Sequence, residues 1–347
     1  MRGAARFLAW ALPPVLALGL MMRPAMAQML EFSDLDGWQD DNHRAALSTF
    51  IDTCTVLDDP DWAPICRLAP DAMASDAAAR GFFEMLFRPV VIGEGPALFT
   101  GYYEPELAGS PVRTPRFLYP IFARPPELQD GQQWLDRGSI EASGALRGRG
   151  LEIAWLEDPV EVFFLQVQGS GRIRMPNGQV MRVGYAGRNG HEYRSVGKEL
   201  IRRGILGEHD VSAQGIKAWV RANPVLGAEL LQHNPSFVFF RRLPDLPPEK
   251  GPIGAMGRSI TTLRSVAVDP EFTPLGAPVW LEKNGRNPLR RLMVAQDTGG
   301  AIKGPQRADI FFGSGVQAGE DAGAVKDDGR MIVLLPIERA FAQLEAE

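Results

Sequence analysis

The sequence predicts a mainly β protein with some helices, in which short strands form barrels rather than one parallel sheet. Most apolar runs are short and are separated by Gly and Pro, a spacing typical of barrel proteins. Helical periodicity is confined to the region after residue 40 and to the middle of the chain. With 347 residues the chain can bury a large core, and this length favours two domains.

The first part of the mature chain is expected to be helical. Asp41 can cap a helix over 44–51, and a second helical pattern begins at Ser75 and runs to residue 87. After Pro89 the pattern changes to β. Strands are predicted at 90–92, 97–100, 117–122 and 160–168, the last because Glu and Gln alternate with Val and Leu there.

A β-hairpin is predicted next, because Pro176-Asn-Gly178 is a turn sequence between β-type residues at 172–174 and 179–183. Helical patterns then return. They cover 193–203, 213–222 with Ser212 as N-cap, and 225–232 after Pro224. A Pro-rich connector at 244–252 precedes the last predicted strands, at 265–268, 279–281, 292–296, 309–312 and 331–335.

The N-terminus has the pattern of a secretory signal peptide. Arg2 and Arg6 precede an apolar run over 7–22, and Ala25-Met-Ala27 is a small-x-small cleavage site. The apolar run is short for a membrane span, although an uncleaved anchor helix is the alternative. We expect residues 1–27 to be removed and the protein to reside in the periplasm or the outer-membrane-associated envelope. The mature chain has no cysteine at its start for lipidation.

Charge and cysteine content limit the kinds of partner and cofactor that the protein is expected to bind. Removal of residues 1–27 deletes three arginines and no acidic residue, so the formal net charge moves from −5 to −8, and a nucleic-acid partner is not expected. Cys54 and Cys66 are the only cysteines, and in an oxidising compartment they are predicted to form a disulfide. The four histidines show no ligand spacing, so we expect neither metal nor cofactor.

The segment 295–315 is the strongest candidate for an active-site loop, because it holds two aspartates, a lysine and five glycines. Glycines allow the backbone to approach a ligand closely. A strand over 309–312 would place Asp309 and Phe311 on one face. A carboxyl beside an aromatic ring can stay protonated near neutral pH, because burial disfavours its charged form. Asp309 is therefore a candidate acid catalyst.

Three other motifs have a different context from the sites that they resemble. Gly169-Ser-Gly171 lacks the third glycine of a dinucleotide loop and precedes a hairpin, not a helix, and Lys303 lies outside a P-loop pattern. Asp297-Thr-Gly299 is the signature of aspartic proteases, which need two such aspartates. The chain has one copy. An aspartic protease is therefore the weakest hypothesis for this chain.

The chain resembles the membrane-bound lytic transglycosylase A (MltA) family, including its C-terminal 3D domain. The resemblance depends on the order of seven markers along nearly the whole mature chain. They are Thr100-Gly-Tyr-Tyr-Glu-Pro105, Phe164-Leu-Gln-Val-Gln-Gly-Ser-Gly171, Val183-Gly-Tyr-Ala-Gly187, Asn234-Pro-Ser-Phe-Val-Phe-Phe240, Ser265-Val-Ala-Val-Asp-Pro270, Pro274-Leu-Gly-Ala-Pro-Val-Trp280 and the segment 295–315.

The resemblance implies a double-psi β-barrel domain with an inserted second β-barrel-like domain, and a groove between them in which glycan lies. The N-terminal part of the first barrel would span 28–106, the inserted domain 107–243 and the C-terminal part of the barrel, the 3D domain, 244–347. The breaks agree with the change of pattern near Leu107 and with the Pro-rich connector.

The activity implied is non-hydrolytic cleavage of the β-1,4 bond between N-acetylmuramic acid and N-acetylglucosamine in peptidoglycan, which leaves 1,6-anhydromuramic ends. One carboxyl can suffice, because the C6 hydroxyl of the substrate replaces water and the same Asp acts as acid and then as base. Hydrolytic glycosidases usually need two carboxyls. The enzyme class is a peptidoglycan lytic exotransglycosylase, a carbon-oxygen lyase, although the residues do not distinguish cuts at strand ends from cuts inside strands. A noncatalytic peptidoglycan-binding barrel is the alternative.

The candidate catalytic residues are Asp309, which matches the family's catalytic position, and Asp297, which could orient the sugar, bind the catalytic carboxyl or only stabilise a turn. Asp269 is expected to be structural. Lys303 is a donor to sugar or a surface cation. The predicted substrate contacts are Thr100, Gly101, Tyr102, Tyr103, Gln166, Gln168, Gly169, Ser170, Gly299, Gly300 and Lys303, with Gln166 and Gln168 on one strand face. The expected partners are peptidoglycan strands and other cell-wall enzymes, and the protein is expected to be monomeric.

Overall fold

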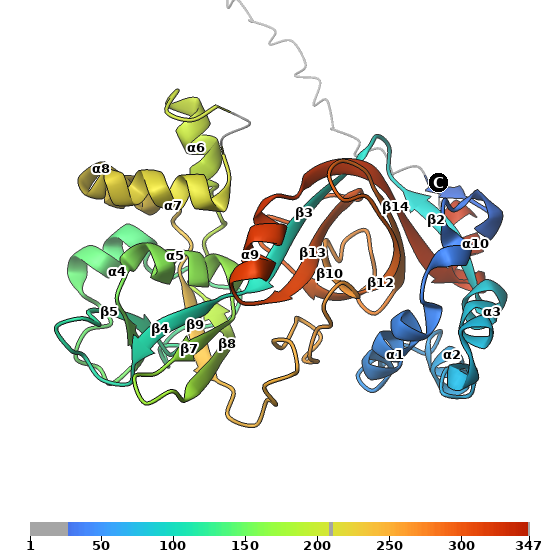
Figure 1. Ribbon diagram of the computed structural model, residues 1–347, viewed down its shortest axis with the longest axis horizontal. Coiled ribbons are helices and arrows are strands. Elements are labelled where there is room, and N and C mark those ends of the chain that lie inside the picture. Colours follow the sequence, from blue (N-terminus) through green and yellow to red (C-terminus); the bar gives the residue numbers. More distant parts are fainter. Residues whose placement is uncertain (1–26, 208–210, 346–347) are drawn as a thin grey trace, which may run out of the picture.

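The structure is a computed structural model that describes residues 27–207 and 211–345. The predicted signal peptide, apart from Ala27, lies outside the described residues. Two β bodies lie side by side, and strand β3 (Ala97–Glu104) leads directly from the larger body into the smaller one (Figure 1). The chain returns to the larger body through a long connection after β9 (Val238–Arg242).

The larger body is a closed barrel of six strands. Its other strands are β10 (Ser265–Val268), β11 (Pro278–Lys283), β12 (Leu289–Thr298), β13 (Arg307–Ser314) and β14 (Lys326–Pro336). They follow the order β14-β11-β12-β10-β13-β3, and β14 also pairs with β3, which closes the barrel. The pairs β10–β12 and β13–β3 are parallel, and β1 (Ala27–Met29) and β2 (Phe87–Ile92) extend the sheet beyond β14.

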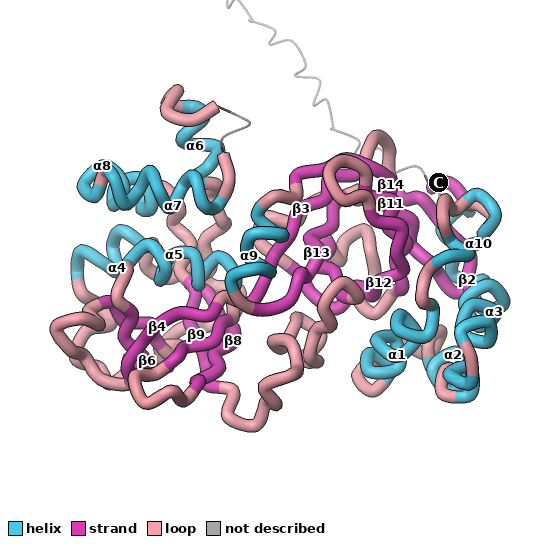
Figure 2. The backbone as a smooth tube through the Cα atoms, viewed as in Figure 1, coloured by secondary structure: helices cyan, strands magenta, loops and turns pink. Residues whose placement is uncertain are grey.

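Helices cover one side of this barrel (Figure 2). They are α1 (His43–Cys54), α2 (Ala63–Leu68), α3 (Asp76–Leu86), α10 (Ile337–Glu345) and the short η1 (Phe32–Asp34), η2 (Trp38–Asp40) and η3 (Asp71–Ala74). Aromatic side chains fill the interface, where Phe50, Trp62 and Trp280 are fully buried. Cys54 and Cys66 form a disulfide between α1 and α2.

The predicted cap of α1 was wrong by one residue. Asn42 accepts the hydrogen bond from the backbone N of Ala45, whereas the carboxylate of Asp41 binds the guanidinium of Arg264 at 2.7 Å. Both residue types cap helices well, so the tertiary partner decided between them.

The smaller body is a six-stranded sheet with the order β5-β6-β4-β7-β8-β9. Its further strands are β4 (Glu106–Ser110), β5 (Tyr119–Phe122), β6 (Glu152–Leu156), β7 (Gly171–Arg174) and β8 (Val180–Arg188). A backbone bridge between Ala123 and Phe240 brings its two edges together, so the sheet is barrel-like. The helices α4 (Arg137–Ser143) and α5 (Pro159–Gln168) lie over it, and α6 (Val196–Arg202), α7 (Ala213–Ala222) and α8 (Pro224–Gln232) form an outer layer (Figure 1).

The predicted strand at 160–168 is helix α5, and this prediction was wrong. Asp158 caps the helix by accepting from the backbone N of Val160, Pro159 occupies the first turn, and Gly169 ends the helix with a positive φ of 77°. Val160, Phe163 and Phe164 follow helical spacing and pack against α6, α7 and α8. Gln166 and Gln168 therefore do not share a strand face.

The predicted architecture, mainly β with helices and a barrel plus a second barrel-like sheet, is confirmed. The hairpin at Pro176-Asn-Gly178 and the helix capped by Ser212 also form. The domain boundaries at 107 and 243 stay a prediction. In the ranges 27–207 and 211–345, no helix has the length and apolar character needed to cross a membrane.

Candidate active site

Four residues form a row across neighbouring barrel strands. Asp297 of β12 and Asp309 of β13 both pair with Ala267 of β10, which lies between them, and Thr100 of β3 pairs with Asp309 on its other side. Residues that pair directly across strands point to the same face of a sheet. The row therefore places the two candidate carboxyls on the same face of the barrel wall.

A β-bulge sets the direction of Asp297. Val266 pairs with Ala295 but Ala267 pairs with Asp297, so Gln296 is an extra residue in β12. Met293 and Ala295 point into the barrel core, and strict alternation would send Asp297 there too. The bulge instead turns Asp297 to the face of Asp309. Gln296 is buried and donates to Thr53 Oγ1 at 2.8 Å, which ties the bulge to α1.

Asp309 is partly buried and has one engaged oxygen. Thr100 Oγ1 donates a hydrogen bond to its Oδ1, while no described residue binds Oδ2. Burial raises the pKa of Asp309, and the Thr100 hydrogen bond and the positive charge of Arg307 oppose that rise. The predicted neighbour Phe311 lies two residues along β13 and is fully buried against the Tyr102 ring, 5.3 Å between centroids.

Asp297 has both oxygens engaged by donors. Tyr102 Oη donates to Oδ2 at 3.0 Å, and the backbone N atoms of Ala255 and Thr298 donate to Oδ1 at 2.9 Å each. Burial raises the pKa of Asp297 to about 6 despite these bonds, and the charge of Asp309 adds to the rise. Burial together with the two carboxylates raises the pKa of Tyr102 well above its usual value, so the phenol stays a donor.

The glycine-rich loop after β12 reaches the smaller body. A side chain added at Gly300 would lie 3.5 Å from Arg188 Nη1 and 3.6 Å from Tyr193 Cβ, in ordinary van der Waals contact, so Gly300 adjoins these two residues of the smaller body. Gly299 is close to Ile302 within the loop. Lys303 is largely exposed, and its Nζ lies 3.5 Å from Asp269 Oδ1.

Asp269 is buried and accepts from the backbone N of Gly304 at 2.9 Å. It therefore holds the base of this loop, in the way that a structural aspartate does.

Several predicted contacts hold the two bodies together or stabilise the smaller one. Gln168 Oε1 accepts from the backbone N of Tyr103 at 3.1 Å, where β3 leaves the barrel. Gln166 is buried and accepts from Arg137 Nη2 at 2.5 Å, and the Arg137 guanidinium lies over the Phe163 ring. The structure therefore places Gln166 in the core of the smaller body, not beside the two aspartates.

The remaining predicted positions have backbone or packing roles. Gly169 ends α5, and Ser170 after it is buried. Gly101 lies against α9 (Val316–Gly323), where an added side chain would come within 2.7 Å of Ala322. A larger residue at Gly101 would displace this helix.

Two groups at the site, Arg307 and the backbone N of Ala255, are not among the residues predicted from the sequence. Arg307 donates to Thr100 Oγ1 at 2.8 Å, and its position two residues before Asp309 on the same strand is a signal that alternation could have given. No sequence pattern could have identified the backbone N of Ala255, because every residue except proline supplies the same N–H group. Within residues 27–207 and 211–345, no group of three or more His, Cys, Asp or Glu side chains could hold a metal ion.

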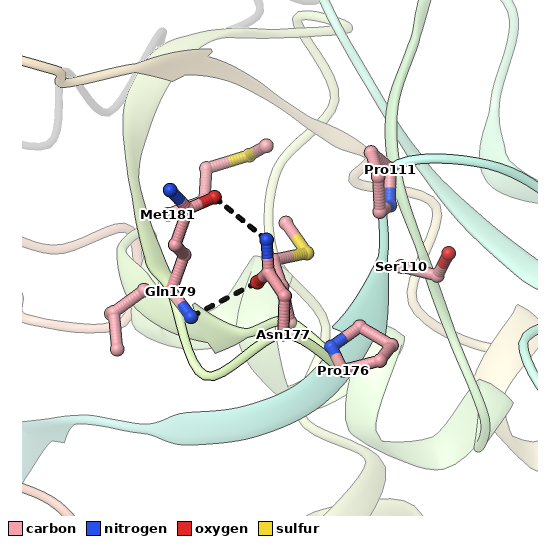
Figure 3. A pocket seen from close by; sticks show the side chains of 8 residues that line it. Ser110, Pro111, Pro176, Asn177, Gln179 and Met181 are labelled. Atoms are coloured by element: carbon pink, nitrogen blue, oxygen red, sulfur yellow. Dashed lines mark hydrogen bonds between the residues drawn. The ribbon is translucent and has the colours of Figure 1, made fainter.

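A separate cavity of about 580 Å³ lies at the end of the smaller sheet (Figure 3). Its lining comes from the β7–β8 hairpin and the end of β4: Ser110, Pro111, Met175, Pro176, Asn177, Gln179, Val180 and Met181. The amide of Asn177 donates to Gln179 Oε1 and so is already partnered within the hairpin. None of the row residues lines this cavity.

Comparisons with known proteins agree with this arrangement. A family model described as the MltA specific insert domain matches residues 98–241, and one described as the 3D domain matches 264–335. A membrane-bound lytic murein transglycosylase A from Vibrio cholerae is 36% identical over 252 residues, which cover 69% of this chain and 65% of that protein. The match thus spans less than two thirds of that relative's length.

Solved structures match over nearly their whole length. A membrane-bound lytic murein transglycosylase from Agrobacterium tumefaciens is 32% identical with a TM-score of 0.82, and the match covers 91% of this chain and 99% of that one. Escherichia coli MltA with bound chitohexaose is 30% identical with a TM-score of 0.72, covering 92% and 96%.

The closed barrel and the second, barrel-like sheet, matched by the MltA specific insert domain and the 3D domain, place the chain among proteins that combine these two domains. The chain belongs to the MltA family of lytic murein transglycosylases.

Proposed function

We propose that the protein is a lytic transglycosylase that cleaves the β-1,4 bond between N-acetylmuramic acid and N-acetylglucosamine in peptidoglycan and leaves 1,6-anhydromuramic ends. One observation carries the proposal: a partly buried carboxyl, Asp309, has a raised pKa and one oxygen that no described residue binds. Membership of the MltA family supports the substrate class, and the E. coli relative holds chitohexaose.

Asp309 performs both proton transfers. In its protonated form it gives the proton on Oδ2 to the glycosidic oxygen as the bond from that oxygen to the muramic C1 breaks. The resulting carboxylate takes the proton of the C6 hydroxyl, whose oxygen bonds to C1 and closes the anhydro ring. Asp309 ends protonated again, and no water is consumed. The raised pKa keeps a fraction of Asp309 protonated at higher pH than a free aspartate allows.

Asp297 supports this chemistry without transferring a proton. Its two oxygens already accept three hydrogen bonds, from Tyr102, Ala255 and Thr298, which hold the carboxyl in place on the barrel wall. Its contribution is a fixed negative charge near the developing positive charge on the muramic C1, the electrostatic role that an ionised, hydrogen-bonded carboxylate has in other glycan-cleaving sites.

The glycan is proposed to lie between the two β bodies. The loop with Gly299, Gly300 and Lys303 would contact it from the barrel, and Arg188 faces this loop from β8. Tyr102 and Tyr103 lie on the strand that joins the two bodies. Export to the periplasm or the outer-membrane-associated envelope, action at strand ends, a monomeric state and contact with other cell-wall enzymes remain our predictions.

Purified sacculi test the proposal directly. After digestion by the mature protein, mass spectrometry of the fragments should find 1,6-anhydromuramic ends. Asp309→Asn should lower their rate of formation by at least about 100-fold, because a general acid contributes factors of this order or more. Asp245→Asn, at an exposed position in the connector with no described partner, is the matched control and should keep full activity.

Two other outcomes would contradict the proposal. Reducing ends in place of anhydro ends indicate a hydrolase. Intact strands that still bind the protein indicate a noncatalytic glycan-binding barrel.

A further inference from the structure

A chain of two hydrogen bonds ends on the catalytic carboxyl. Arg307 Nη2 donates to Thr100 Oγ1 at 2.8 Å, and Thr100 Oγ1 donates to Asp309 Oδ1. A guanidinium has donors only, so Thr100 must accept from Arg307. The hydroxyl has a single hydrogen, which is then left for Asp309. The chain therefore has one direction, from Arg307 through Thr100 to Asp309.

We propose that Thr100 and Arg307 are positioning residues that determine which oxygen of Asp309 carries the acid proton. The inference rests on the proposed function. Because Oδ1 already accepts the only hydrogen of Thr100, the proton of the acid form lies on Oδ2. That oxygen has no described protein partner and is the one free to meet the glycosidic bond. Without these two hydrogen bonds, the acid proton could reside on either oxygen of Asp309.

The guanidinium of Arg307, which begins this chain of hydrogen bonds, is itself held firmly. Arg307 Nη1 donates to the carbonyl of Ala308 at 2.7 Å and to that of Leu98 at 3.3 Å, so it is tied to both strands that carry Thr100 and Asp309. No described carboxylate lies within ion-pair distance of Arg307. Its charge acts on Asp309 through space, and its hydrogen bond also polarises the hydroxyl of Thr100.

The same two residues act on both halves of the reaction. Burial raises the pKa of Asp309, whereas the Thr100 hydrogen bond and the Arg307 charge lower it. The balance leaves an acid that can donate its proton and a carboxylate that is still stabilised afterwards. The other titratable groups that act electrostatically with this carboxyl are Asp297 on β12 and Tyr102 on β3, and Lys326 on β14 pairs with Thr100 but is exposed.

This assignment changes the predicted role of Thr100. A direct sugar contact would make loss of the hydroxyl raise KM. A positioning role predicts a lower kcat with little change in KM, because the bound ground state does not use the hydroxyl. It also predicts a changed pH profile, which a purely structural role would not produce.

The test measures kcat and KM against pH on defined muramic oligosaccharides for the mature protein and for Thr100→Val and Arg307→Met. Valine keeps the β-branched shape of threonine and removes the donor. We expect kcat to fall about 10- to 100-fold with KM within about twofold. In both variants the high-pH limb of the curve of kcat against pH, where Asp309 loses its proton, should move to higher pH. The reason is that Thr100 and Arg307 both lower the pKa of Asp309 in the native site. Thr100→Ser keeps the hydroxyl and should restore both the limb and kcat.

An unmoved high-pH limb in whichever variant folds, or a raised KM at native kcat, overturns the proposal. The two hypotheses fail separately. If the native protein yields no anhydro product, the proposed function fails; if it does yield that product and the limb of the variants stays in place, only the positioning role fails.

Discussion

Glu104 and Arg182 join the barrel to the inserted sheet. Arg182 Nη2 donates to Glu104 Oε1 at 2.6 Å, and both side chains are almost fully buried, with exposed fractions of 5% and 1%. Arg172 donates to the other carboxylate oxygen at 2.8 Å, as does Ser314 of β13 at 2.7 Å. Glu104 ends β3, so this cluster lies where the chain passes between the two bodies and fixes their contact.

Glu104→Gln should destabilise the protein by about 3–5 kcal/mol, because it leaves the buried Arg182 and the partly buried Arg172 without a charged partner. Urea denaturation measures the free energy of unfolding. The control is Glu106→Gln, two residues along, whose ion pair with Arg174 is much more exposed and should be worth less than about 1 kcal/mol. If both variants lost the same free energy of unfolding, burial of the Glu104 cluster would add nothing to stability.

Tyr102→Phe should shift the low-pH limb of kcat/KM. The phenol of Tyr102 donates a hydrogen bond to Asp297. Burial raises the pKa of Asp297 to about 6, and this hydrogen bond keeps the pKa from rising further. Loss of the bond raises the pKa further, so Asp297 stays neutral up to higher pH and the low-pH limb moves upward. Phe311→Leu, which alters the same ring contact but no hydrogen bond, is the control. A limb that moves equally in both variants would point to packing instead.

His43 should make the protein less stable in mild acid. The ring is fully buried, and neither nitrogen has a hydrogen-bond partner among the described residues. Burial lowers its pKa below 6.5, against the opposing charges of Asp41 and Asp76. The unfolded chain therefore binds the proton first, and stability falls as pH drops below about 6.5, by at most about 1.4 kcal/mol per pH unit.

His43→Phe keeps a ring against Trp38 and removes the titration. Urea denaturation between pH 8 and pH 5 should show a weaker loss of stability for this variant than for the native protein. Parallel curves would assign the acid sensitivity to other groups.

Loss of the disulfide should destabilise the helical cover of the barrel. Cys54 and Cys66 are 12 residues apart, and cross-links that close short loops of this kind are worth about 2–4 kcal/mol. The double variant Cys54→Ser, Cys66→Ser should therefore unfold at lower urea concentration. The native protein with reductant serves as the comparison, and an unchanged midpoint in both would contradict the expectation.

Local patterns alone determined much of the fold. Ser212 before a 3.6-residue period identified α7, and Pro176-Asn-Gly178 identified the β7–β8 hairpin, because capping and turn formation involve only neighbouring residues. Helix α5 was misread as a strand because its apolar residues fit both periods. Asp158, Pro159 and Gly169 were helix-boundary signals at its ends, and they should have decided the assignment.

The sequence by itself also determined that Asp309 lies on a strand after a glycine-rich loop, and its family markers indicated the class of enzyme. Only the tertiary structure decided which groups surround that carboxyl. Thr100 reaches it across a strand pair more than 200 residues apart, and Asp297 reaches the same face through a bulge that Gln296 anchors to α1. Strand register and bulges depend on long-range pairing and packing, which no local pattern contains.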